Sequence, residues 1–145
     1  MGVYPFMFGT ASDFTPIVSD LVSKDFREPY DWDAYAQSFF PQAEHLTRIA
    51  QAAESSGETE KASEYYLRAS AVYRISRFPA PRSDVQRQAW KLGKDVCLKG
   101  LQLRPHPVSE VQVPHSYRHA DEGEFIPVYH LVPETASPEA PVPTV

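Results

Sequence analysis

The segment VSEVQVPHSYRHADEGEFIPVYHLV, residues 108–132, decides the fold class, because the hydrophobic period of the chain changes to two there. Apolar residues recur at alternate positions in both halves of the segment, at Val111, Val113, Ile126, Val128 and Val132. Such alternation is typical of β-strands, and the DEG triplet at 121–123 supplies a turn. The segment therefore predicts a β-hairpin. Pro114 and Pro127 predict that it lies at a sheet edge, where a missing N–H is tolerated.

This hairpin should not be stable by itself, because two isolated strands are only marginally stable in water. We expect it to be covered by a helical layer or continued by further strands. The sequence PVPTV at 141–145 could begin a third strand.

The residues before the hairpin repeat their apolar positions every three or four residues, as amphipathic helices do. Thr15 followed by Pro16 predicts the N-cap and first position of a short helix that runs to about Val22. A longer apolar stripe follows over residues 31–53, where Pro41 is expected to start or kink a helix.

The turn SSGE at 55–58 separates that stripe from a second one over residues 62–73, and the pair predicts a helical hairpin. Ser83 is a suitable N-cap for a last helix, with Gly100 near its end. The aromatic residues of these helices suit either a core or a flat ligand, and a core is the favoured interpretation. They are Trp32, Tyr35, Phe39, Tyr65, Tyr66 and Tyr73.

Composition excludes several classes of partner and compartment. At 145 residues and 42% hydrophobic content, the chain is large and apolar enough for one globular domain. Its 14 basic and 19 acidic residues give a net charge of −5, which argues against nucleic acid and anionic membranes as partners. The single cysteine, Cys97, indicates a reducing compartment, and no signal or membrane-spanning segment is predicted. We therefore expect a cytoplasmic protein.

Four motifs occur in the order found in one enzyme family: VYPF at 3–6, DFTPI at 13–17, AVYRISRFP at 71–79 and EVQVPHSYRHADEGEFIPVYHLVP at 110–133. With them the chain resembles fungal α/β-hydrolases of the yellowish-green pigment type, which are related to bacterial pseudooxynicotine hydrolases. The resemblance implies serine-dependent cleavage of an acyl or carbon–carbon bond in an aromatic polyketide of pigment and secondary metabolism.

The resemblance also implies an α+β organisation in which the catalytic sheet is missing from this chain. Residues 1–104 would be a helical, cap-like region, and 105–132 the hairpin that begins the hydrolase core. Residues 133–145 would be a Pro-rich tail or the start of a truncated strand. Such enzymes place the serine in a GxSxG elbow, but the glycines stand at 2, 9, 57, 93, 100 and 123, no two of them four apart. We therefore expect a truncated or partial family member without catalytic residues, cofactor or metal, and inactive alone.

The candidates for a substrate pocket are Tyr73, Arg74, Arg77 and Phe78. Guanidinium groups donate hydrogen bonds in pairs to planar oxygens, which suits an acidic, carbonyl-rich ligand such as an aromatic polyketide. The structural alternative, which we favour, is that the two arginines clamp the β-hairpin to the rest of the domain through ion pairs.

The turn of the β-hairpin is a candidate metal site, because imidazole and carboxylate side chains lie close together in the sequence there. His115, His119, Asp121 and Glu122 form a usable ligand set, but their spacing converges on a helix and not at a strand end. Surface histidines beside an acidic turn are therefore the favoured interpretation.

Two further functional alternatives stay open. The chain could be a small helical interaction module that docks on a hydrolase or another partner through its aromatic helix faces. It could also be the non-catalytic half of a split hydrolase, or form a homo-oligomer through the exposed apolar face of the hairpin.

Overall fold

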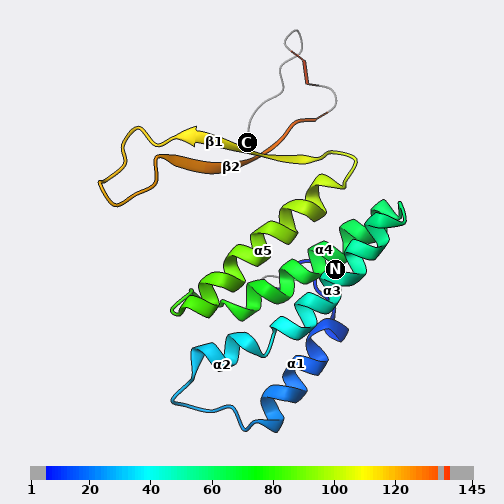
Figure 1. The fold of residues 1–145 in the computed structure, drawn as a ribbon, viewed down its shortest axis with the longest axis vertical. Coiled ribbons are helices and arrows are strands. Elements are labelled where there is room, and N and C mark those ends of the chain that lie inside the picture. Colours follow the sequence, from blue (N-terminus) through cyan, green and yellow to red (C-terminus); the bar gives the residue numbers. More distant parts are fainter. Residues whose placement is uncertain (1–5, 134–135, 138–145) are drawn as a thin grey trace.

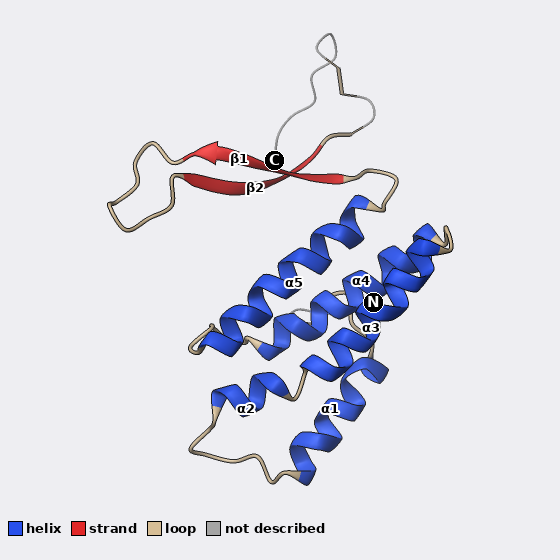
Figure 2. Cartoon of the chain, viewed as in Figure 1, coloured by secondary structure: helices blue, strands red, loops and turns tan. Residues whose placement is uncertain are grey.

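The computed structural model describes residues 6–133 and 136–137. Within them a helical bundle precedes a two-stranded antiparallel sheet, which confirms the α+β class (Figures 1 and 2). The predicted tail at 133–145 lies almost wholly outside the described residues. The elements are α1 (Ala11–Ser23), α2 (Trp32–Gln37), α3 (Phe40–Ser55), α4 (Thr59–Ser76), α5 (Asp84–Gln102), β1 (Val108–Pro114) and β2 (Phe125–Leu131).

Helix α1 begins one turn earlier than predicted. Thr10 is its N-cap, and the carboxylate of Asp13 accepts hydrogen bonds from the Thr10 backbone N–H and hydroxyl, both at 2.9 Å. Pro16 therefore lies inside the helix and not at its first position, so the prediction of a start at Thr15 is wrong. The capping interactions of Asp13 fix the start at Thr10 in spite of the N–H that Pro16 lacks.

The apolar stripe at 31–53 forms two helices, α2 and α3, that are interrupted at residues 38–39. Asp31 caps α2, because its carboxylate accepts hydrogen bonds from the backbone N–H groups of residues 33 and 34 at 3.0 Å. Pro41 lies in the first turn of α3, as predicted for a residue that starts a helix. The turn before α4 is also confirmed, and Gly57 adopts the left-handed φ of 75° there that glycine allows without strain.

Helix α4 is the centre of the bundle, since both α3 and α5 pack along it. The predicted stripe is confirmed, because Ala62, Tyr66, Ala69, Val72 and Tyr73 are at most 3% exposed. Other members of the core come from the remaining helices: Ile17, Phe39, Ala43, Leu46, Ala50, Ala89 and Val96. The aromatic side chains of α4 thus mainly build the core.

Ser83 caps α5 as predicted, since its hydroxyl accepts a hydrogen bond from the Gln86 N–H at 3.1 Å. Gly100 lies near the end of this helix, where its role is close packing. A Cβ there would lie 2.8 Å from Cγ of Leu67 on α4. The Ser63 hydroxyl of α4 donates to the carbonyl of Gly100 at 2.7 Å. The missing side chain therefore lets the two helices approach.

The predicted β-hairpin is confirmed. Strands β1 and β2 pair with Val111 opposite Val128 and Val113 opposite Ile126, and the connecting loop spans residues 115–124, longer than the predicted DEG turn. The His115 N–H donates to the Glu124 carbonyl at 2.9 Å. Since hydrogen-bonded pairs alternate along an antiparallel ladder, Pro114 and Pro127 fall at outward-pointing positions, in agreement with the prediction of edge placement.

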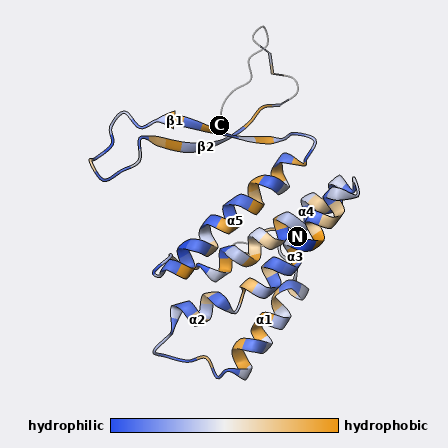
Figure 3. Ribbon diagram, in the orientation of Figure 1, coloured by the Kyte–Doolittle hydropathy of each residue, from blue (hydrophilic) through white to orange (hydrophobic). Residues whose placement is uncertain are grey.

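The two faces of the hairpin have different neighbours. Val108 is buried beside α5, and Tyr129 lies on the same face, so this face points to the bundle. The opposite face, called the outer face below, points away from the helices. Its apolar residues are Val111, Val113, Ile126 and Val128, which are 41–44% exposed, and the polar pair Ser109 and His130 lies on the same face. Figure 3 shows hydrophobic residues along both strands.

Candidate functional site

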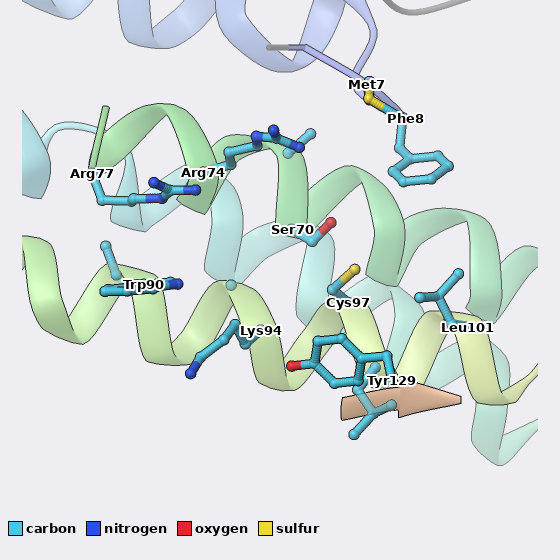
Figure 4. Close-up of a pocket in the computed structure, with 14 residues that line it drawn as sticks. Met7, Phe8, Ser70, Arg74, Arg77, Trp90, Lys94, Cys97, Leu101 and Tyr129 are labelled. Atoms are coloured by element: carbon cyan, nitrogen blue, oxygen red, sulfur yellow. The ribbon is translucent and has the colours of Figure 1, made fainter. Parts of the chain in front are cut away.

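A pocket lies between α4 and α5, and it is closed at one end by the segment before α1 and by β2 (Figure 4). It encloses about 170 Å³. Its walls are mostly apolar, with contributions from Met7, Phe8, Ala71 and Leu101. The charged side chains on its lining are all basic: Arg74, Arg77 and Lys94. The pocket is therefore an apolar slot with a positive rim.

Helical spacing explains how the sequence assembles these walls. Trp90, Lys94, Cys97 and Leu101 recur at intervals of four and three residues, so they share one face of α5. Gly93 lies on the same helix, and a Cβ at this position would be 3.1 Å from Cβ of Tyr73 on α4. The absence of that Cβ lets the two helices approach closely at the slot, which Gly93 also lines.

The exposed indole of Trp90 is flanked by two cations. The Arg77 guanidinium lies 5.6 Å and the Lys94 ammonium 5.3 Å from the ring centroid, both within cation–π range. Among the described residues, no carboxylate lies within 4.0 Å of either cation. Arg77 and Lys94 are therefore held against the Trp90 ring and pair with no carboxylate in the described part of the chain.

Two polar groups of the pocket keep their protons at neutral pH. Burial raises the pKa of the Cys97 thiol, and the nearby Ser70, Arg74 and Arg104 offset this only in part. Burial also raises the pKa of the Tyr129 hydroxyl, with additional contributions from Glu110, Cys97 and Asp95. Cys97 is thus a thiol and not the thiolate that nucleophilic chemistry requires. Tyr129 is a neutral hydrogen-bond donor.

The structure brings together two of the four predicted pocket residues. Arg74 in the last turn of α4 and Arg77, the C-cap residue of this helix, both line the slot. Tyr73 is 3% exposed and packs on Phe40 with ring centroids 5.6 Å apart, so it belongs to the core. Phe78 lines a different, open pocket. For Arg77, the contact given by the structure is the Trp90 ring and not the predicted ion pair.

Among the slot residues that the sequence did not predict are three with aromatic or charged side chains: Trp90, Lys94 and Tyr129. The spacing of Trp90 and Lys94 puts them on one face of a helix, which was a usable signal. Their position opposite Arg77 depends on how α5 packs on α4, and no local pattern encodes that. Tyr129 reaches the slot from β2, far away in the sequence.

A second pocket of about 620 Å³ lies between α1 and α2 and is wide open. Phe26, Tyr30, Trp32 and Tyr35 contact one another there, with centroid distances of 5.4–6.1 Å. Trp32 and Tyr35 are thus the members of the predicted aromatic set that line a pocket. Phe39, Tyr66 and Tyr73 are buried in the core, as the favoured interpretation predicted.

Among the described residues, the most deeply buried ion pair has a structural role. Asp13 of α1 is 1% exposed, and its carboxylate accepts from the Arg68 guanidinium of α4 at 2.7 and 3.1 Å. Burial raises the pKa of Asp13, but the hydrogen bonds from Arg68 and Thr10 outweigh it and leave the pKa lowered. Arg68 also lies 4.4 Å from the Tyr65 ring centroid. This pair joins α1 to the bundle and faces none of the pockets described above.

The histidines of the hairpin loop do not gather with enough partners for a metal site. His115 Nε2 lies 3.9 Å from Glu122 Oε2, and the same carboxylate accepts from the His119 N–H at 2.8 Å. Over residues 6–133 and 136–137, no three histidine, cysteine or acidic side chains are placed to hold a metal ion. Nor does any helix of this part have the length and hydropathy to cross a membrane.

Comparison with known proteins gives no family assignment. No protein-family model matches the chain, and no curated protein matches it. The resemblance to pigment-type hydrolases therefore depends on its four sequence motifs and stays a prediction.

Proposed function

We propose that these residues form the helical cap and the first two strands of a serine hydrolase that cleaves an acyl or carbon–carbon bond in aromatic polyketides. The nucleophile, the base and the remaining sheet would come from residues outside this sequence. Arg74 and Arg77 would help to bind the substrate. In this proposal residues 1–145 alone bind but do not hydrolyse.

The outer face of the hairpin is the observation that carries the proposal. Four branched aliphatic side chains in two cross-strand pairs, Val111 with Val128 and Val113 with Ile126, face away from the bundle. A sheet that is apolar on both faces is typical of α/β folds, where helices cover both sides. The outer face therefore fits the beginning of a larger sheet better than a free-standing hairpin.

The buried serines of the core support the statement that residues 1–145 alone do not hydrolyse the substrate. Ser63, Ser70 and Ser76 are buried, and their hydroxyls donate to the carbonyls of Gly100, Leu67 and Ala36 at 2.7–3.0 Å. A nucleophilic serine needs a base that accepts its proton and an exposed position at a strand-to-helix turn. These three hydroxyls instead connect helices or satisfy backbone carbonyls.

The proposal is tested first on the DNA that follows the codon of Val145. A reading frame that continues through a strand into GxSxG and later Asp and His is expected. A stop codon with no such remnant in any frame would contradict the proposal. The second test compares hydrolysis of an aryl ester by residues 1–145 and by the extended product. We expect turnover only from the extended product, and serine-directed labelling of the short chain would sink the idea.

A split hydrolase is the second candidate, and the same outer face favours it. The interaction module that docks through aromatic helix faces is disfavoured, because Phe39, Tyr66 and Tyr73 are buried within the bundle itself. A partner would instead meet the hairpin. If a separate chain carries the catalytic sheet, mixing it with residues 1–145 should restore activity. Substituting Val111 and Val128 by lysine should then abolish the restored activity without unfolding the bundle.

A further inference from the structure

We propose that the slot between α4 and α5 is a binding site for a small aromatic carboxylate, whose ring enters the slot and whose anion meets Arg77 and Lys94 at the rim. This goes beyond the proposed function, since it asks only for binding and holds whether or not the chain belongs to a hydrolase.

The size and walls of the slot select the ring. An apolar cavity of about 150 Å³ in another protein holds benzene, so the 170 Å³ here suits one ring, and the open side leaves room for a second fused ring. Ala71, Leu98 and Leu101 give flat apolar contact, and the face of Phe8 closes one end. Aromatic rings in such a slot gain both burial and stacking.

The charges at the rim select the anion. Arg77 and Lys94 flank Trp90, and no carboxylate of the described residues pairs with them. Arg74, which precedes Arg77 by three residues, also lines the slot. This concentration of positive charge stands out in a chain of net charge −5. A cleft lined by one sign of charge beside low-dielectric walls attracts the opposite sign.

Tyr129 adds a neutral donor on the β2 side. In Figure 4 its hydroxyl points towards the part of the slot where Lys94 lies. The carboxylates of Asp95 and Glu110 are close enough to raise the pKa of this hydroxyl, so the β2 end is less positive than the Arg77 end. An anion is therefore expected at Arg77 and Lys94, with Tyr129 contacting the ring or a polar substituent on it.

A carboxylate fits this rim better than a phosphate does. Guanidinium donates to either group, but the walls are mainly apolar and the slot holds little besides a ring. A singly charged group attached directly to a ring can stay at the mouth while the ring is buried. Free inorganic phosphate has no apolar part to place in the slot, and a doubly charged phosphate on a ring loses more hydration than a carboxylate does.

The test is calorimetric titration of residues 1–145 with 2-naphthoate and with its uncharged isostere 2-naphthamide. Naphthoate should bind, and naphthamide about tenfold more weakly, because a charge-assisted contact is lost. Arg77→Gln and Lys94→Gln should each lower the affinity for naphthoate several-fold and leave naphthamide nearly unchanged. Lys91→Gln is the matched control, since Lys91 is exposed on the same helix but does not line the slot.

Several results would overturn the proposal. Equal affinity for the two probes, or no binding of either, would exclude a charge-selective aromatic site. An equal loss of naphthoate affinity in Lys91→Gln would show that the effect comes from the overall charge of the chain. Displacement of naphthoate by equimolar inorganic phosphate would show a general anion patch. Thermal unfolding of each variant checks that the bundle is intact, and ester hydrolysis plays no part, so these outcomes do not depend on the hydrolase proposal.

Discussion

The helical bundle and the β-hairpin differ in how completely their apolar side chains are buried. In the bundle, Leu46, Tyr66 and Val72 are at most 2% exposed, and α4 is covered from two sides. In the hairpin, Val111 and Ile126 are each 44% exposed, although they are as apolar as the core residues. The bundle therefore completes its own core, whereas the hairpin carries an apolar surface that nothing in the described residues covers. The predictions below test this contrast.

The largest effect is expected at the link between α1 and α4. Asp13→Ala leaves the Arg68 guanidinium, 15% exposed, without its main partner. Removing one member of a buried ion pair costs about 3–5 kcal/mol of stability. Urea unfolding followed by helical circular dichroism measures this loss.

The matched control for that variant lies on the same helix. Asp20 pairs with Lys24 at 2.6 Å on the surface, with side chains 40% and 56% exposed. Exposed pairs of this kind are screened by solvent and contribute little, so Asp20→Ala should change stability far less than Asp13→Ala. Equal losses in the two variants would mean that Asp13 is not a special anchor.

The next effect compares the two regions directly. Leu46→Ala removes a core side chain that is 2% exposed, and it should cost about 2–5 kcal/mol. Val128→Ala, at a site 41% exposed, should cost less than about 1 kcal/mol. Urea unfolding of both variants measures the difference. If the two variants lose similar amounts of stability, Val128 is packed as well as the core residues are. The difference in burial between the bundle and the hairpin would then be refuted.

Acid should weaken the bundle through Asp13. The folded-state pKa of this carboxyl is lowered, so its contribution is present above the unfolded pKa, near 3.8, and is lost as the pH falls through the folded value. The melting temperature of the wild type should therefore fall below about pH 4. The Asp13→Asn variant should have a lower melting temperature than the wild type at pH 7. Its melting temperature should also fall less as the pH is lowered. An unchanged slope in this variant would refute the assignment.

Substitutions on the outer face should change stability least, but they should change self-association clearly. Val111→Thr combined with Val128→Thr keeps the β-branched shape but adds hydroxyls, so each should change stability by about 0.5 kcal/mol or less. Self-association through the exposed apolar face should decrease. Light scattering over a concentration series measures it. A wild type that stays monomeric at high concentration would contradict this expectation.

Local signals in the sequence were enough for much of the fold. The turn before α4, the Ser83 cap and both strands could be predicted, because each depends on residues within a few positions. The start of α1 was mispredicted although its signal is local, because Thr10 and Asp13 form a capping box three residues apart, and Arg68, 55 residues away, holds Asp13 in addition. Pro16 gave the stronger local signal, and it was misleading.

The candidate site shows the same limit. The arginines were recognised from their motif, but a motif does not say which side of a helix faces a cavity. Tyr73 lies next to Arg74 in sequence, yet it points into the core while Arg74 lines the slot. Trp90 and Lys94 join the site only through the packing of α5 on α4. Helix packing, and not residue type, therefore decided the site.

The two prolines of the hairpin make its open edges unequal. On β1 the outward backbone donors at Val108, Glu110 and Gln112 are followed by Pro114 only at the strand's end. On β2 the outward row is interrupted in its middle by Pro127, between Phe125 and Tyr129. An incoming strand would find an unbroken ladder of partners along β1 and a gap along β2. An added strand would therefore pair better along β1 than along β2.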